Sequence, residues 1–284
     1  MAVVEARFKF LARLDRFVAE KPFFVTTAAD IEFDPAKHTN IEHEIKSVKV
    51  HDIRGRQSQF SIALSGFQVI DHTPKLLELE TLDHVAAYKQ ETQEVLKNLF
   101  QAEHAITFDL RIRKNERVPN AVLDLNNPLD IDSPVKEAHN DYTFTSGPIV
   151  VKRELIGRGL ERYLRPGYRF RIVNFWRSIL PVVRDAPLAF CDFRTVQSED
   201  TVVVDRIRPD RTGEIFHFHF NEKQKWYYLD SMTSEEPVAF VTYDTAAGSH
   251  ARFCPHVSFT PDSTDNSVPP RLSVETRSII ITPI

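Results

Sequence analysis

The chain has 284 residues, of which 42% are hydrophobic and 27% are charged, with a formal net charge of −4 and a pI near 6.3. These totals indicate a globular protein that can bury a large core, and they exclude disorder as its default state. Because a nucleic-acid-binding surface would show as a basic stripe, the slight acidic excess argues against a nucleic-acid partner.

Cysteine use and the N-terminal sequence bear on the compartment. The two cysteines, Cys191 and Cys254, are too few for the disulfide framework of a small secreted domain, so we expect a reducing environment. Residues 2–19 lack the order of basic, apolar and small residues that marks a signal peptide, and no run of about 18 apolar residues could span a bilayer. We therefore expect a cytoplasmic protein without a membrane partner.

Most of the N-terminal half is predicted to be β-structure. Residues 3–11 alternate between apolar and charged side chains, which favours a half-buried strand, although residues 8–14 would also suit a helical face. Further strand-like stretches follow, with a turn at residues 54–56 between the second and the third of them. These stretches are residues 23–25, 48–53, 60–64 and 66–70.

One helix is clearly marked in this half. Between residues 82 and 100, apolar side chains recur near helical spacing among Lys, Glu and Gln, so we expect a helix that packs on the outside of a sheet. Residues 104–113 then alternate, which indicates a strand with one face in the core. Residues 115–133 are rich in Asn, Asp and Pro and are predicted to form a loop.

The C-terminal half is predicted to consist mainly of short strands. A break at residues 146–148 precedes a short amphipathic helix over residues 151–164, which Pro166 and Gly167 end. Several short apolar or aromatic segments follow, bounded by Pro, Gly, Asp or Asn. They are residues 168–176, 188–193, 213–220, 225–229, 238–243, 252–259 and 272–282.

This order of elements indicates the fold class. Many short strands without helix–strand alternation imply a sandwich or barrel rather than a doubly wound sheet, so we predict a mainly β protein with flanking helices. The sequence has no internal repeats and no obvious linker. Residues 1–284 are therefore expected to form one domain, in which an N-terminal β/α extension over about residues 1–135 packs on the core.

His139 and Asp141 are the first candidate metal ligands. Positions i and i+2 of a strand face the same side, so both side chains could bind one metal ion. The pattern alone is common by chance, but a further histidine would complete the two-histidine-one-carboxylate triad of non-haem iron(II) oxygenases. His256 supplies it from a strand-like segment 115 positions after Asp141. We favour it over His250, which follows Gly248 in a predicted turn.

Arg271 is a candidate anchor for a keto-acid cosubstrate. It lies 15 positions after His256, at the head of the last predicted strand, and the planar fork of an arginine binds a carboxylate through two parallel hydrogen bonds. Arg277 has the same strand parity and is the alternative anchor. A salt bridge, for example to Glu275 or Asp185, is the ordinary structural interpretation of either arginine.

Other polar side chains leave alternatives open. Tyr227 or Tyr228, and Thr143, are candidate hydroxyl donors to the same cosubstrate. His217 and His219 form a second same-face pair, which would suit a cupin-like metal site. We favour instead two polar residues on the exposed face of an aromatic strand, with contact to substrate or to the metal ligands as an intermediate case.

Several motifs resemble one known family. They are HDIRG at 51–55, HNDYT at 139–143, NFWR at 174–177, VRDAPLAFCD at 183–192, KWYY at 225–228, PHVSF at 255–259 and PRLSVETR at 270–277. In this order they resemble the AsaB and CmcJ-like hydroxylase/desaturase family, which includes gibberellin desaturase-like proteins. The resemblance implies a double-stranded β-helix core of jelly-roll, cupin-like type, with iron(II), 2-oxoglutarate and O2 as cofactor and cosubstrates. Carried over by position, it assigns the iron to His139, Asp141 and His256.

The function expected from these observations is the oxidation of a small molecule. An iron(II)- and 2-oxoglutarate-dependent dioxygenase of this kind hydroxylates or desaturates a natural-product intermediate, and its protein part chiefly positions the substrate. The alternatives are a cupin-like metal-dependent hydrolase or isomerase and a non-catalytic ligand-binding barrel. Arg271 distinguishes the oxygenase from the hydrolase or isomerase, because hydrolysis needs no residue that anchors the carboxylate of a cosubstrate. The substrate, the oxidative outcome and a homodimeric state are left open.

Overall fold

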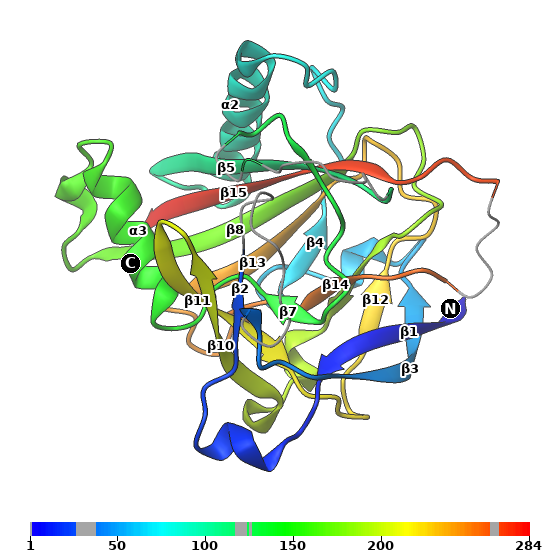
Figure 1. Cartoon of the computed structure of the whole chain (residues 1–284). Coiled ribbons are helices and arrows are strands. Elements are labelled where there is room, and N and C mark those ends of the chain that lie inside the picture. The colour runs from blue at the N-terminus through cyan, green and yellow to red at the C-terminus, as the bar shows by residue number, and fades with distance from the viewer. Residues whose placement is uncertain (1, 27–37, 117–123, 125–126, 262–266) are drawn as a thin grey trace.

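The computed structural model describes residues 2–26, 38–116, 124, 127–261 and 267–284. Within them the strands form two sheets around a shared core (Figure 1). The nine-stranded sheet has the order β1-β3-β12-β9-β14-β7-β11-β10-β2, and the six-stranded sheet has the order β4-β13-β8-β15-β5-β6. Neighbouring strands are often far apart in sequence, so both sheets depend on long-range pairing.

The elements have the following bounds. The nine-stranded sheet contains β1 (Val3–Leu11), β2 (Phe23–Val25), β3 (His43–Asp52), β7 (His139–Asn140), β9 (Leu188–Cys191), β10 (Thr201–Arg208), β11 (Arg211–Phe218), β12 (Trp226–Tyr228) and β14 (His256–Ser258). The six-stranded sheet contains β4 (Phe67–Val69), β5 (His104–Lys114), β6 (Ile131–Asp132), β8 (Tyr168–Ser178), β13 (Val238–Asp244) and β15 (Leu272–Pro283). The described α-helices are α2 (Leu82–Leu99) and α3 (Ser146–Ile156), and short 3-10 turns cover Asp15–Val18, Gln57–Gln59, Glu161–Tyr163, Phe193–Thr195 and Ser198–Asp200.

Aromatic side chains fill the space between the two sheets. The ring centroid of Phe190 in β9 lies 5.1 Å from that of Phe67 in β4 and 5.2 Å from that of Phe240 in β13. Such buried rings contribute much of the hydrophobic stabilisation of a sandwich. The imidazole of His256 lies 4.7 Å from the ring of Phe240, so this aromatic core reaches one of the candidate metal ligands.

Helix α2 confirms the helix predicted over residues 82–100. Thr81 caps it by accepting a hydrogen bond from the backbone N–H of His84 at 3.2 Å, which is the usual role of a threonine at this position. The helix lies against the six-stranded sheet (Figure 1). Leu96 from its apolar stripe is buried there with Val173 and Ile280. The helix therefore covers the face of that sheet which points away from the core.

Most of the predicted strands are confirmed. Residues 3–11 form a strand rather than a helix, residues 104–113 lie within β5, and Arg54 and Gly55 lie in a turn as expected. The predicted loop over residues 115–133 falls partly outside the described residues. Its end contains β6, which pairs in parallel with β5.

Two local predictions were wrong, and one strand was missed. Residues 60–64 form turns, because the backbone N–H groups of Leu64 and Ser65 donate to the Ser61 carbonyl at 3.2 and 2.8 Å instead of to a neighbouring strand. The helix expected over residues 151–164 is α3, which begins at Ser146 and ends at Ile156. Pro148 does not break it, because the first turn needs no backbone N–H donor. Strand β10 was not predicted at all.

The structure bears on two further expectations, the single domain and the absence of a membrane-spanning segment. The single domain with its N-terminal extension stays a prediction, and the structure adds that strands from residues 1–135 take part in both sheets. Among the described helices, none is long and apolar enough to cross a membrane.

Candidate metal centre and adjoining cavities

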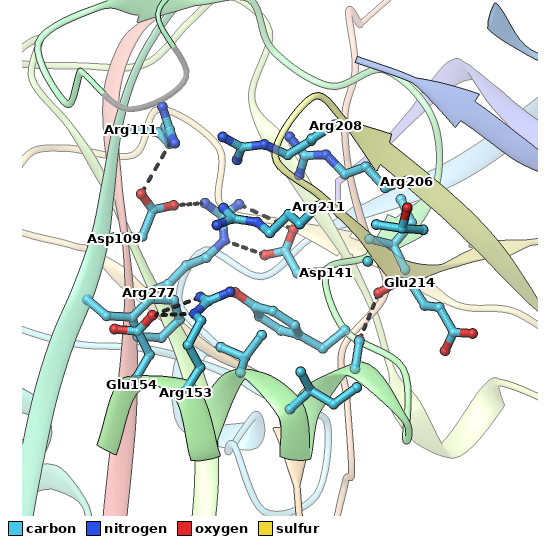
Figure 2. A pocket seen from close by; sticks show the side chains of 18 of the residues that line it. Asp109, Arg111, Asp141, Arg153, Glu154, Arg206, Arg208, Arg211, Glu214 and Arg277 are labelled. Carbon is cyan, nitrogen blue, oxygen red and sulfur yellow. Dashed lines mark hydrogen bonds and ion pairs between the residues drawn. The ribbon is translucent and has the colours of Figure 1, made fainter. Parts of the chain in front are cut away.

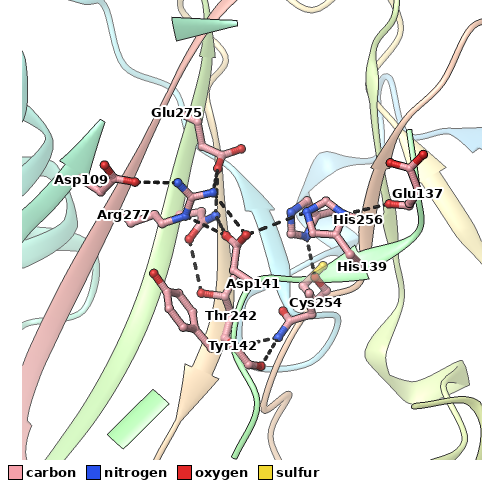
Figure 3. A network of polar contacts seen from close by, with 12 residues as sticks. Asp109, Glu137, His139, Asp141, Tyr142, Thr242, Cys254, His256, Glu275 and Arg277 are labelled. Carbon is pink, nitrogen blue, oxygen red and sulfur yellow. Dashed lines mark hydrogen bonds and ion pairs between the residues drawn. The ribbon is translucent and has the colours of Figure 1, made fainter. Parts of the chain in front are cut away.

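His139, Asp141 and His256 lie together at the centre of the nine-stranded sheet (Figure 3). β7 and β14 pair through His139 and His256, which brings the two ring centroids to 4.3 Å. Asp141 follows β7 directly, and its Oδ1 lies 3.9 Å from Nε2 of His139. One ligand atom from each of the three residues lies within 4.8 Å of the others, which is close enough for all three to bind one ion.

Both imidazoles are oriented by backbone carbonyls. Nδ1 of His139 lies 2.8 Å from the Glu137 carbonyl oxygen, and Nδ1 of His256 lies 3.0 Å from that of Cys254. When Nδ1 donates its proton to a carbonyl, the lone pair of Nε2 is left for a metal. Burial, together with the neighbouring His256, lowers the pKa of His139 to about 4, and burial lowers the pKa of His256 as well. Both rings are therefore neutral near pH 7.

Asp141 is held as a carboxylate. Its burial would raise its pKa, but Arg277 and the two histidines lower it further than burial raises it. Nε of Arg277 donates to Oδ2 at 2.9 Å, Nη2 donates to Oδ1 at 3.2 Å, and Nδ2 of Asn174 donates to Oδ2 at 2.6 Å. Two neutral imidazoles and one ionised carboxylate are the donor set of the iron(II) facial triad.

Arg277, the alternative cosubstrate anchor, is already engaged. Besides Asp141, its guanidinium pairs with Asp109 at 2.8 Å and with Glu275 at 2.9 Å. Burial lowers its pKa, but these carboxylates outweigh that effect and raise it well above the ordinary value. The ordinary salt-bridge interpretation therefore describes this arginine, whose fork has no free side for a further carboxylate.

Arg271 is buried without a matching charge. Nη1 donates to the Ala186 carbonyl oxygen at 2.6 Å and to Oγ of Ser258 at 3.0 Å, both neutral acceptors. Asp185 accepts only its backbone N–H, at 2.8 Å. In the described part of the chain no carboxylate lies within ion-pair distance of the guanidinium, and burial lowers its pKa to about 9. A buried cation of this kind is costly unless an anion joins it.

A small cavity connects Arg271 to the histidines. His139, His256 and Trp176 line it with Arg271, and its volume is about 20 Å³. Nε of Arg271 and Nε1 of Trp176 are both buried without a hydrogen-bond partner. Two residues of this lining therefore each have an unsatisfied hydrogen-bond donor. The cavity is large enough for about one water molecule. A five-carbon keto acid would have to displace some of the lining side chains.

A much larger cavity lies on the other side of Asp141 (Figure 2). Its volume of about 870 Å³ falls in the range of small-molecule sites. β10, β11, β5 and α3 supply its walls, and Arg113 and Arg277 line both cavities. Its apolar wall includes Phe108, Tyr142, Ile149, Val150 and Ile215.

The predicted hydroxyl donors Thr143 and Tyr227 do not line either cavity. Oγ1 of Thr143 is buried and bonded to Oε2 of Glu214 at 2.9 Å, and it accepts from the backbone N–H of Ser146 at 3.0 Å, so it organises the start of α3. Tyr227 packs against Phe60, with ring centroids 4.7 Å apart. Neither side chain belongs to the lining of the two cavities described above. Their roles toward the cosubstrate stay predictions.

The exposed His217–His219 pair was predicted wrongly for one member. His217 is only 5% exposed, because the second half of β11, which contains it, is buried on both faces. Its ring stacks on that of His43 at 5.9 Å, and burial lowers its pKa to about 3. His219 is half-buried, and its Nδ1 lies 2.8 Å from the Leu11 carbonyl oxygen.

Two residues of the site were missed from the sequence. Asn174, next to Asp141, was seen only as part of a family motif, and Arg206, in the wall of the large cavity, was not singled out at all. The signal for Asn174 was a polar residue within an apolar strand. For Arg206 it was the alternation of β10, which places Val204, Arg206 and Arg208 on one face.

Comparison with known proteins leads to the same interpretation of the chain. A family model described as an oxidoreductase/YMDC permease-like domain matches residues 8–281. The hydroxylase/desaturase efuI of Hormonema carpetanum is 26% identical over 89% of each chain, and the Fe(II)/2-oxoglutarate-dependent dioxygenase nvfI of Aspergillus novofumigatus is 28% identical over 82% of each. A gibberellin cluster GA4 desaturase of Gibberella fujikuroi is 24% identical over 70% of this chain and 75% of its own.

The solved structures agree with the fold prediction. The iron and alpha-ketoglutarate-dependent endoperoxidase NvfI superposes with a TM-score of 0.82 at 25% identity and 99% coverage of both chains. A tryptophan-to-phenylalanine variant of that endoperoxidase gives a TM-score of 0.85 at 24% identity, over 100% of this chain and 99% of that one. With the two curled sheets, this similarity confirms the predicted double-stranded β-helix. The chain therefore belongs to the family described as an oxidoreductase/YMDC permease-like domain, and its predicted membership of the AsaB/CmcJ-like hydroxylase/desaturases is confirmed.

Proposed function

We propose that this protein is an iron(II)- and 2-oxoglutarate-dependent oxygenase that hydroxylates or desaturates a small-molecule natural-product intermediate. Its relatives are named hydroxylase/desaturases and a dioxygenase of this kind. The observation that carries the proposal is the buried set of His139, Asp141 and His256 beside an unpaired Arg271. This combination offers a metal-binding face and a place for the carboxylate of a keto acid.

The three candidate ligands already have the protonation states that iron(II) binding requires. His139 and His256 present neutral Nε2 atoms, and Asp141 presents an ionised carboxylate. Bound iron, 2-oxoglutarate and O2 together supply an oxidant that removes hydrogen from a substrate C–H bond. The protein holds the ligands on short strands and keeps Asp141 aligned through Arg277.

Arg271 would receive the distal carboxylate of 2-oxoglutarate. A guanidinium binds a carboxylate through two charge-assisted hydrogen bonds, and here it would also remove the cost of a buried unpaired cation. Ser258 already contacts Nη1 at 3.0 Å and lines the same small cavity, so its hydroxyl is placed to contact the same group. Nε1 of Trp176 is a further free donor there.

The large cavity would hold the substrate. It borders Asp141, so a substrate in it would lie next to the bound iron. Apolar side chains such as Phe108 and Ile215 would exclude water from that volume and help to orient the molecule. A zinc hydrolase would have no use for an unpaired arginine beside the two histidines, which favours the oxygenase over that alternative.

The decisive experiment measures cosubstrate binding without needing the substrate. Anaerobic protein is titrated with Fe(II) and then with 2-oxoglutarate, and the metal-to-ligand charge-transfer absorbance is followed. We expect wild-type protein to develop this absorbance and His139→Ala to lose it. Arg271→Ala should need at least about tenfold more 2-oxoglutarate, as expected when a charged hydrogen-bonded pair is lost.

The control for this titration is an exposed arginine. Arg165→Ala removes a guanidinium from the surface and should leave both titrations unchanged. Wild-type protein that binds Fe(II) but develops no absorbance with 2-oxoglutarate would contradict the proposed function. Equal 2-oxoglutarate affinity in Arg271→Ala and wild type would contradict the anchor alone. The cytoplasmic location, the single domain and the homodimer stay predictions.

A further inference from the structure

The large cavity has more positive than negative charge. Eight basic and six acidic side chains line it. Two of the acidic residues, Asp205 and Glu214, are each paired at 2.6 Å with Lys21, which lies outside the lining. Lys21 therefore neutralises part of this negative charge from behind the wall. Asp210, also outside the lining, does the same for the positive charge of Arg208 and Arg211, so the interior keeps an excess of cations.

Arg206 is the arginine of this wall that has no paired carboxylate among the described residues. Arg153 pairs with Glu154, and Arg277 pairs with three carboxylates, as described above. Arg206 has no ion pair or hydrogen bond with any residue that the structure describes, and its Nε is buried without a partner. Burial, with the nearby charge of Arg277, lowers its pKa to about 10. Its guanidinium thus lacks the anion that a desolvated arginine requires.

We propose that the large cavity binds a substrate that carries a carboxylate, and that Arg206 receives this group. The inference rests on the proposed function, because it assigns the large cavity to the oxygenase substrate. Arginine suits the role because its fork matches the planar geometry of a carboxylate. The apolar wall beside it would hold the hydrocarbon part of the same molecule, so the substrate class is an amphipathic organic acid.

The carboxylate of 2-oxoglutarate is the other possible source of the anion. Arg271 lines the small cavity with both histidines, whereas Arg206 lines the large cavity. Two uncompensated arginines in different cavities indicate two different carboxylates. The experiment below separates the two sources by keeping the cosubstrate site saturated.

The test compares a carboxylate probe with its neutral isostere. Binding of 2-naphthoate and of 2-naphthamide is measured by calorimetry on anaerobic protein loaded with Fe(II) and saturating 2-oxoglutarate. We expect wild-type protein to bind 2-naphthoate at least about tenfold more tightly than the amide, the size of effect that one charge-assisted pair gives. Equal affinities, or no 2-naphthoate binding up to its solubility limit, would overturn the proposal.

Substitutions then assign the preference to one side chain. Arg206→Gln should abolish the preference for 2-naphthoate and leave 2-oxoglutarate affinity unchanged, while Arg206→Lys should restore part of it. Arg7→Gln, on an exposed position of β1, should retain the full preference. If Arg206→Gln does not fold, Arg206→Lys and the probe pair on wild-type protein still decide the outcome. An unchanged preference in Arg206→Lys and Arg206→Gln alike would overturn the role of Arg206.

Two further readouts keep this inference separate from the proposed function. If 2-oxoglutarate displaces 2-naphthoate competitively, the anion site belongs to the cosubstrate and the inference is overturned. If the charge-transfer absorbance is absent but metal-free protein still prefers 2-naphthoate through Arg206, the proposed function fails while the carboxylate site stands.

Discussion

At the scale of single residues, Asp141 is held from two directions. Arg277 donates two hydrogen bonds to its carboxylate, and Asn174 donates a third at 2.6 Å. The amide of Asn174 is fixed in turn, because its Nδ2 also contacts Glu275 at 3.2 Å and its Oδ1 accepts from Thr242 at 3.3 Å. Groups that orient a metal ligand in this way contribute to metal affinity without touching the metal.

We therefore predict that Asn174→Ala weakens Fe(II) binding. Without the amide donor, Asp141 loses one of the hydrogen bonds that fix the orientation of its carboxylate. The dissociation constant for Fe(II) should therefore rise about tenfold or more. Anaerobic calorimetry with Fe(II) measures this change. Ser178→Ala, on the same strand, removes a hydroxyl whose one hydrogen bond to a described residue goes to the Leu180 carbonyl, so it should leave the affinity unchanged. Equal affinity in Asn174→Ala and wild type would show that Arg277 alone orients the carboxylate.

The residues that sequence reasoning found and missed differ in how they are brought to the site. His139 and Asp141 could be paired because strand parity is a local property. Asn174 and Arg277 meet Asp141 only because β8 and β15 pair in a register that places these two residues opposite each other. No local pattern encodes that register. Arg206 depends likewise on β10 joining β11, far from the metal ligands in sequence.

At the scale of elements, α3 shows how one close contact positions a wall of the large cavity. Gly147 lies in the first turn of the helix, and the ring of Tyr243 from β13 packs directly against it. A side chain at this position would overlap the ring. The glycine therefore lets α3 approach the sheet and places Ile149 and Val150 at the cavity.

Gly147→Ala should accordingly destabilise the protein and disturb the cavity. Because the added Cβ would meet the Tyr243 ring, we expect a loss of about 1–3 kcal/mol in the free energy of unfolding, the usual cost of overpacking. Denaturant unfolding measures this loss, and binding of 2-naphthoate should weaken in parallel. Gly213→Ala serves as the control for stability, because nothing lies within 4 Å of the Cβ it would add. Unchanged stability in Gly147→Ala would mean that α3 can shift away from the Tyr243 ring without a cost in stability.

Strand β10 explains why part of the fold escaped sequence analysis. Its second half contains Asp205, Arg206 and Arg208, a charged stretch that does not look like a strand within a sheet. The structure accommodates these charges because this half of the strand borders the large cavity. Apolar patterning predicts elements that face a core, and it fails where a strand faces a binding site.

At the scale of the whole molecule, the candidate metal ligands sit on the weakest part of the nine-stranded sheet. β7 has two residues and β14 has three, and the two strands pair only through His139 and His256. A ladder this short contributes little stability by itself. A metal ion bound by ligands on both sides of this pair would join the two halves of the sheet.

This arrangement predicts that metal binding stabilises the fold. A ligand that binds only the folded state adds about 2.7 kcal/mol when its concentration is 100 times the dissociation constant. We expect the thermal midpoint of wild-type protein to rise with added Fe(II) under anaerobic conditions, and more at higher metal concentration. The rise should disappear in His256→Ala, and because each variant is compared with itself without metal, the direct effect of the substitution cancels.

His250→Ala provides the matched control, because His250 was the competing choice for the third ligand. It is exposed, and its backbone N–H donates to the Ala247 carbonyl at 2.8 Å in a turn, away from β14. His250→Ala should therefore retain the full metal-induced rise. If the metal-induced rise persists in His256→Ala but vanishes in His250→Ala, the third ligand is His250 and not His256. If both variants keep the rise, the stabilising metal binds at another site.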